Sequence, residues 1–79
     1  MKNQTTNNAH DAYKARTHDI ARLLGVLRME LNQHAKGAKR DPRCWGKVGD
    51  LGKVRNDLID LVAFISNKQR DEVENFLAD

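Results

Sequence analysis

One cysteine, one tryptophan and three histidines are the side chains of this 79-residue chain with the widest chemical repertoire. Cys44 lies near Arg40, Arg43 and Lys47, whose positive charges favour a thiolate. A nucleophilic cysteine also needs a base and an oxyanion-binding group, and beyond His34 the sequence indicates neither. We therefore expect no catalytic residue and no enzymatic activity, with Cys44 as a small apolar residue packed under a turn.

The histidine and cysteine spacings do not match a metal site. The chain contains no CxxC, HxxxH or HExxH pattern, and His10 and His18 stand about two helical turns apart. The glycine-rich residues 46–52 lack the preceding strand and the GxxxxGK[ST] pattern of a phosphate-binding loop. We expect neither a metal nor a cofactor, and a lone cysteine excludes an intrachain disulfide.

Basic residues concentrate in the middle of the chain. Residues 36–55 contain seven basic and two acidic side chains, a net charge of +5, whereas the rest carries −2. Basic residues interleaved with an aromatic can bind phosphates and stack on bases. The candidate contacts with a partner or a phosphate are Lys39, Arg40, Arg43, Trp45 and Lys47. We favour a structural role for Trp45, as a plug packed on His34 or Leu31 at the end of a helix bundle, over a contact role.

The pattern of apolar residues predicts a first helix over about residues 9–36. Apolar or aromatic residues recur on one stripe at helical spacing, with His34 completing its seven-residue period: Tyr13, Ile20, Leu23, Leu24, Leu27 and Leu31. Residues 1–8 are polar, and we expect them to be disordered. Gly37 is expected to end the helix as a left-handed cap.

A connection over about residues 37–46 leads to a second predicted helix over about residues 47–78. Asp41-Pro42 is typical of a helix start, but Gly46, Gly49 and Gly52 oppose an early helix, so its start stays open between Pro42 and Asp50. The second stripe comprises Leu51, Val54, Leu58, Leu61, Val62 and Ile65. If the second helix contains a kink or a break, we expect it at Ser66-Asn67.

These elements predict an all-α protein with one domain over residues 9–79, an antiparallel hairpin of two long helices. The second helix is apolar on more sides than a hairpin can bury. The candidate association surface comprises Leu58, Ile59, Val62, Phe64 and Ile65. We expect a homodimer that closes a four-helix bundle. The alternative is a monomeric three-helix bundle, with a short C-terminal helix over residues 70–78 folded back over Ile59 and Phe64.

The net charge of +3 is modest for a protein that reads a nucleic-acid groove. We therefore expect a protein-interaction or regulatory module with a protein partner, of the kind found as accessory or inhibitor proteins of mobile elements. The alternative is RNA or DNA binding by a basic helical-hairpin dimer. The densest apolar run, residues 61–65, is too short to span a bilayer, and residues 1–8 lack the apolar core of a signal peptide. We expect a cytoplasmic protein without a membrane partner.

Overall fold

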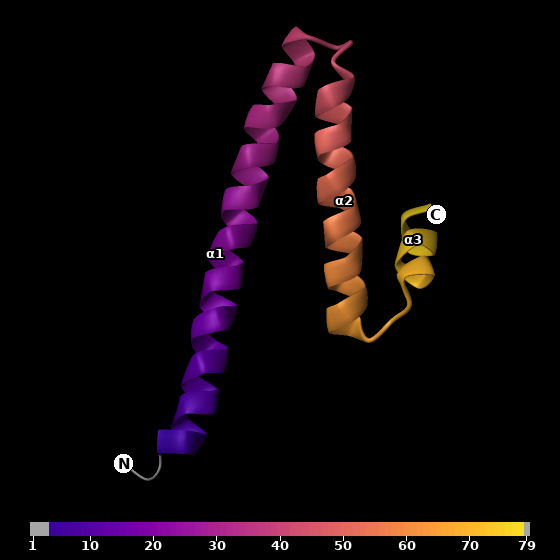
Figure 1. Ribbon diagram of the computed structural model, residues 1–79. Coiled ribbons are helices and arrows are strands. Elements are labelled where there is room, and N and C mark those ends of the chain that lie inside the picture. The colour runs from indigo at the N-terminus through magenta and orange to yellow at the C-terminus, as the bar shows by residue number, and fades with distance from the viewer. Residues whose placement is uncertain (1–3, 79) are drawn as a thin grey trace. The chain divides into compact units, whose positions relative to one another are not determined.

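The computed structural model describes the backbone of residues 4–78 and the side chains of residues 8–78. These residues form three helices and no strand: α1 (Gln4–Arg40), α2 (Trp45–Ser66) and α3 (Arg70–Ala78) (Figure 1). The prediction of an all-α protein is confirmed. The chain divides into two compact units rather than the single domain expected over residues 9–79. The first unit ends at Arg40 and contains α1, and the second begins at Asp41 and contains α2 and α3.

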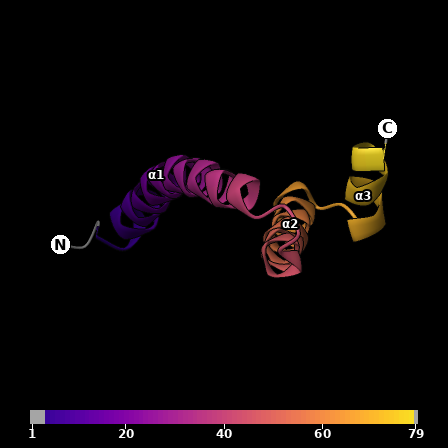
Figure 2. The same cartoon turned by 90° about the horizontal axis from the view of Figure 1, so that it is seen from above.

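Helix α1 is longer at both ends than the predicted range of 9–36. It runs unbroken from Gln4 to Arg40 (Figure 2), and residues 1–3 of the stretch expected to be disordered lie outside the described residues. The prediction for Gly37 is also wrong, because no described glycine has a positive φ and the helix continues through it. The helix ends before Asp41, because the ring of Pro42 disfavours helical geometry at the preceding residue.

The apolar stripe of α1 remains largely accessible. Tyr13, Ile20, Leu23 and Leu24 are exposed, whereas Leu27, Leu31 and His34 are half-buried. Thr17 belongs to the same stripe, and its hydroxyl donates to the carbonyl oxygen of Tyr13 at 2.8 Å. This hydrogen bond satisfies the hydroxyl within the helix itself, so that Thr17 does not interrupt α1.

A tight turn, not a helical cap, contains Asp41 and Pro42. The N–H of Cys44 donates to the carbonyl oxygen of Asp41 at 3.1 Å, which places Pro42 and Arg43 at the centre of the turn. Asp41-Pro42 therefore does not start the second helix, although the pair is typical of a helix start. Cys44 precedes α2 with φ −81° and ψ 96° and makes no side-chain capping bond. Helix α2 starts at Trp45, within the range of Pro42 to Asp50 that the sequence left open.

The predicted single helix over residues 47–78 is wrong, because the chain leaves the helix after Ser66. Asn67 adopts the left-handed conformation, with φ 61° and ψ 36°. Its N–H donates to the carbonyl oxygen of Phe64 at 3.3 Å, and the N–H of Lys68 donates to that of Ala63 at 3.0 Å. This pair of bonds is the Schellman motif, which ends a helix and reverses the chain. The alternative of a break at Ser66-Asn67 followed by a short C-terminal helix is confirmed.

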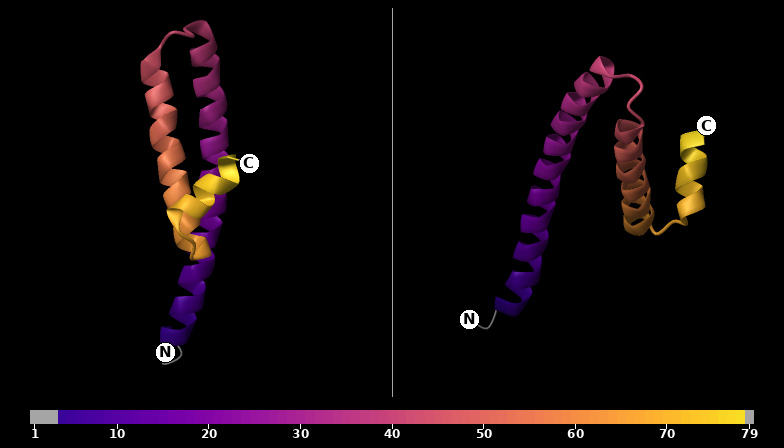
Figure 3. Two further views of the ribbon diagram at one scale, coloured as in Figure 1. Left: turned by 90° about the vertical axis from the view of Figure 1, so that its right-hand side faces the viewer. Right: turned by 45° about the horizontal axis from the view of Figure 1, so that its top comes forward.

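Helix α3 begins with one side-chain capping bond and one backbone turn bond between Gln69 and Glu72, and it folds back along α2. The N–H of Gln69 donates to Oε2 of Glu72 at 3.3 Å, and the N–H of Glu72 donates to the carbonyl oxygen of Gln69 at 3.1 Å. The chain then runs back beside the last turns of α2 (Figure 3). Ile59 on α2 and Val73 on α3 are the buried hydrophobic side chains of the described residues, and they form the core of the second unit.

Candidate functional site

Arg70 joins α3 to α2 through several polar contacts. Its Nη2 donates to Oδ1 of Asn56 at 2.7 Å, and its Nη1 forms an ion pair with Asp60 and donates to the carbonyl oxygen of Asn56. Its Nε also donates to Oε2 of Glu74, on α3 itself, at 3.2 Å. The hydrogen bond to Asp60 is the main reason why the pKa of Arg70 is raised further above its ordinary value. The guanidinium therefore carries its charge at every accessible pH and orients the start of α3.

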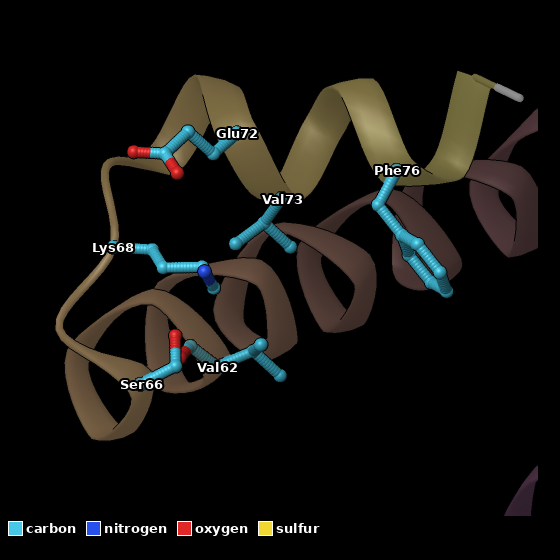
Figure 4. Close-up of a pocket in the computed structure, with 6 residues that line it drawn as sticks. All are labelled: Val62, Ser66, Lys68, Glu72, Val73 and Phe76. Atoms are coloured by element: carbon cyan, nitrogen blue, oxygen red, sulfur yellow. The ribbon is translucent and has the colours of Figure 1, made fainter.

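An open pocket of about 350 Å³ lies between α2 and α3 (Figure 4). Val73 and Phe76 from α3 and Val62 from α2 give it an apolar lining, and the side chain of Lys68 extends between the two helices. The Ser66 hydroxyl at its rim donates to the carbonyl oxygen of Val62 at 2.6 Å. The pocket therefore combines an apolar surface with the cationic Lys68 and the acidic Glu72 in its lining.

The structure separates the members of the predicted association surface. Phe64 and Ile65 are 79% and 80% exposed, Val62 is also exposed and lines the pocket, and Leu58 is half-buried. The prediction is wrong for Ile59, which is only 2% exposed. The physical reason is that α3 lies against the side of α2 that carries Ile59, with Arg70 holding Asn56 and Asp60 on the same side.

The other side of α2 carries a second apolar stripe. Leu51, Val54, Leu58, Leu61 and Ile65 follow one another at intervals of three and four residues, the spacing of a helical seam. Leu51, Leu61 and Ile65 are exposed, and Val54 and Leu58 are half-buried. Nearby, Nζ of Lys53 donates to Oδ2 of Asp57 at 2.6 Å, and this hydrogen bond raises the pKa of Lys53. Helix α2 therefore has one side covered by α3 and another that remains accessible.

The basic candidates are divided between the two units. Lys39 and Arg40 lie in the last turn of α1, where positive charge is favourable beside the terminal carbonyl groups. Arg43 lies in the turn, Trp45 begins α2, and Lys47 is half-buried in its first turn. Trp45 is 78% exposed; its interpretation as a plug packed on His34 or Leu31, which belong to the other unit, stays a prediction.

The described residues were also compared with the requirements of a metal site and of a membrane-spanning helix. Among residues 8–78, no group of three or more histidine, cysteine, aspartate or glutamate side chains lies close enough to hold a metal ion. Within the part of the chain that the structure describes, no helix combines the length and apolar composition needed to cross a lipid bilayer.

Sequence reasoning missed the contacts of Arg70 with Asn56 and Asp60. Arg70 and Glu74 stand four residues apart, a signal for a pair within one helix. The contacts with α2, however, join residues 10 and 14 positions apart and depend on the chain reversal at Asn67. Asn67 itself carried a usable signal, since asparagine is the commonest residue after glycine at a left-handed helix end.

The chain matches no protein-family model, and neither the curated proteins nor the solved structures compared with it give a match.

Proposed function

We propose that this protein is a non-enzymatic interaction module, which binds protein through apolar helix faces and acts as an accessory or regulatory protein. The observation that carries the proposal is the exposure of large apolar side chains on every helix. They include Ile20, Leu23 and Leu24 on α1, Leu61, Phe64 and Ile65 on α2, and Phe76 on α3. Only Ile59 and Val73 among the described hydrophobic residues are buried.

The arrangement of these side chains supports the proposal more than their number does. A single exposed leucine is normal on a soluble protein, but a continuous apolar patch marks an interaction surface. On α1 the positions Ile20, Leu24, Leu27 and Leu31 follow intervals of four, three and four residues. This is the spacing of helices that pack along one another as a coiled coil or a bundle. A partner that fits both stripes is therefore another helix.

In the arrangement that we propose, α1 and α2 form an antiparallel hairpin, and two hairpins form a four-helix-bundle homodimer. The stripe of α1 and the stripe of α2 have the same three-and-four spacing, which allows their side chains to interdigitate in a common core. Dimerisation would bury apolar surface that the two units leave accessible. The faces outside the bundle core, such as the pocket lined by Val62, Val73 and Phe76, remain for a protein partner.

The test compares two aspartate substitutions on α1. Leu24 belongs to the apolar stripe and is 55% exposed, whereas Met29 lies outside it and is 64% exposed. Leu24→Asp is expected to weaken self-association by more than a hundredfold, because each Leu side chain contributes about 1.5–3 kcal/mol and a symmetric dimer loses two. Met29→Asp introduces the same charge and is expected to leave association unchanged. Sedimentation equilibrium measures both. Equal behaviour of the two variants, or a wild-type monomer, would contradict the proposal.

A second candidate function, nucleic-acid binding, is favoured by one observation, the exposure of Trp45 beside Arg43 and Lys47. An accessible indole can stack on a base while nearby cations contact phosphates. Because Trp45 is exposed, Trp45→Ala is expected to change the free energy of unfolding by less than about 0.5 kcal/mol. The affinity of the wild-type chain and of Trp45→Ala for generic RNA and duplex DNA, measured at low and moderate salt, then tests this second function. The second function requires salt-sensitive binding at micromolar protein that Trp45→Ala reduces, and its absence excludes this function.

A further inference from the structure

One flank of α1 has a residue order that is complementary to itself. Because seven residues make nearly two helical turns, residues seven positions apart lie along one side of a helix. On the flank that includes Leu23, these residues are Ala9, Arg16, Leu23, Glu30 and Gly37, all within α1 (Gln4–Arg40). A small residue stands at each end, opposite charges stand between, and an apolar residue lies at the centre. Leu23 is 64% exposed, so that this flank is accessible.

This order has a clear consequence for a second helix turned end to end. A twofold axis through Leu23 brings Arg16 beside Glu30 of the second copy, and Glu30 beside Arg16 of the second copy. Leu23 meets its own copy, and Ala9 lies beside Gly37. Arg16 and Glu30 are about 21 Å apart along one helix, too far to pair within it. Neither forms an ion pair with any described residue of its own chain.

The overall charge of α1 also favours antiparallel pairing. Residues 4–21 of the helix contain two basic and two acidic side chains, with a net charge of zero. Residues 22–40 contain five basic residues and one acidic residue, with a net charge of +4. Two parallel copies would place the +4 segments side by side, whereas antiparallel copies place each +4 segment against a neutral one. Ile20, Leu24 and Leu27 lie next to Leu23 on the stripe and provide the apolar part of the contact.

We infer that the occupant of this face is a second copy of the chain, with α1 antiparallel to α1 of that copy and the twofold axis at Leu23. The inference rests on the proposed self-association and adds to it the helix, the orientation and the register. Such an interface is isologous, since each residue pair occurs twice, and it closes at two chains. Arg16 and Glu30 select the register, and Leu23 with its apolar neighbours provides the affinity.

The experiment is a charge-swap cycle in the full-length chain, read as the dimer dissociation constant at low salt by sedimentation equilibrium. In the Arg16→Glu dimer, residue 16 of each chain is a glutamate beside Glu30 of the other chain, which gives two repulsive acidic pairs. In the Glu30→Arg dimer, residue 30 of each chain is an arginine beside Arg16 of the other chain, which gives two repulsive basic pairs. Each is expected to weaken the dimer about tenfold, since two exposed pairs are changed at once. The double variant R16E/E30R restores both attractive pairs and is expected within about threefold of wild type. Circular dichroism confirms that every variant keeps its helix content.

Arg22→Glu is the matched control, because it makes the same change of charge as Arg16→Glu but lies about a quarter turn or more from this flank. It is expected to change the dissociation constant by no more than about twofold. If the dissociation constant of the double variant is raised by the product of the two single-variant factors, the inference is overturned, while the proposed self-association remains intact. A wild-type chain that stays monomeric at all concentrations would overturn both.

Discussion

The substitution Val73→Ala is expected to weaken the docking of α3 on α2 by an amount that follows from the burial of this side chain. Val73 is 8% exposed, so Val73→Ala removes two buried methyl groups, a loss of about 1.6 kcal/mol. Alanine is the better helix former, which returns about 0.5 kcal/mol. The net loss of about 1 kcal/mol corresponds to an approximately fivefold lower equilibrium constant for docking. The nine-residue α3 has little helical stability of its own, so its protection depends on docking.

Native-state hydrogen exchange measures this change directly. The amide groups of residues 74–78 are expected to exchange about fivefold faster in the Val73→Ala variant. Val48→Ala is the matched control, because it makes the same substitution at a valine on α2 that is 55% exposed. It is expected to leave the exchange of α3 unchanged. Equal effects of the two substitutions, or unchanged exchange in Val73→Ala, would refute the assignment of Val73 to the core.

Three further predictions concern the second unit. Arg70→Ala is expected to speed exchange in α3 more at low salt than at 1 M NaCl, because salt screens the accessible ion pair with Asp60 but not the hydrogen bonds to Asn56; an effect that is independent of salt would contradict a contribution from the ion pair. Asn67→Val is expected to cost about 1–2 kcal/mol in thermal unfolding, since Asn67 has φ 61°, whereas Asn67→Gly stays within about 0.5 kcal/mol of wild type; equal costs would contradict the left-handed assignment. Gly49→Ala is expected to stabilise the protein by about 0.8–1 kcal/mol, because a Cβ there meets no atom within 4 Å; a loss of stability would reveal a close contact at this glycine.

Sequence periodicity was sufficient for the helices but not for their ends. The apolar spacing in residues 13–31 and 51–65 predicts α1 and α2 because helical faces repeat every three or four residues. Helix ends depend instead on competing local preferences. Gly37 permits a left-handed cap without requiring one, and Pro42 is equally suited to the first turn of a helix and to a tight turn. At Gly37 the helix continues, contrary to the expected cap, and at Pro42 the chain forms the tight turn.

The candidate site was less predictable, because burial of one face of α2 depends on a distant segment. Nothing in the spacing around Ile59 distinguishes it from Phe64 as an accessible residue. The difference arises when Asn67 reverses the chain and Val73 and Arg70 bring α3 against that face. Trp45 differs from Ile59 in the opposite direction. A single tryptophan is usually buried, but Trp45, at the start of α2, is exposed.

The measurement that tests the proposed interaction module most directly is the mass of the wild-type chain in solution, determined by light scattering over a range of micromolar concentrations at moderate salt. The exposed apolar stripes of α1 and α2 predict a mass that approaches twice the 9.0 kDa of one chain as the concentration rises. A constant mass of 9.0 kDa over the whole range, with all helices formed, would contradict self-association through these faces.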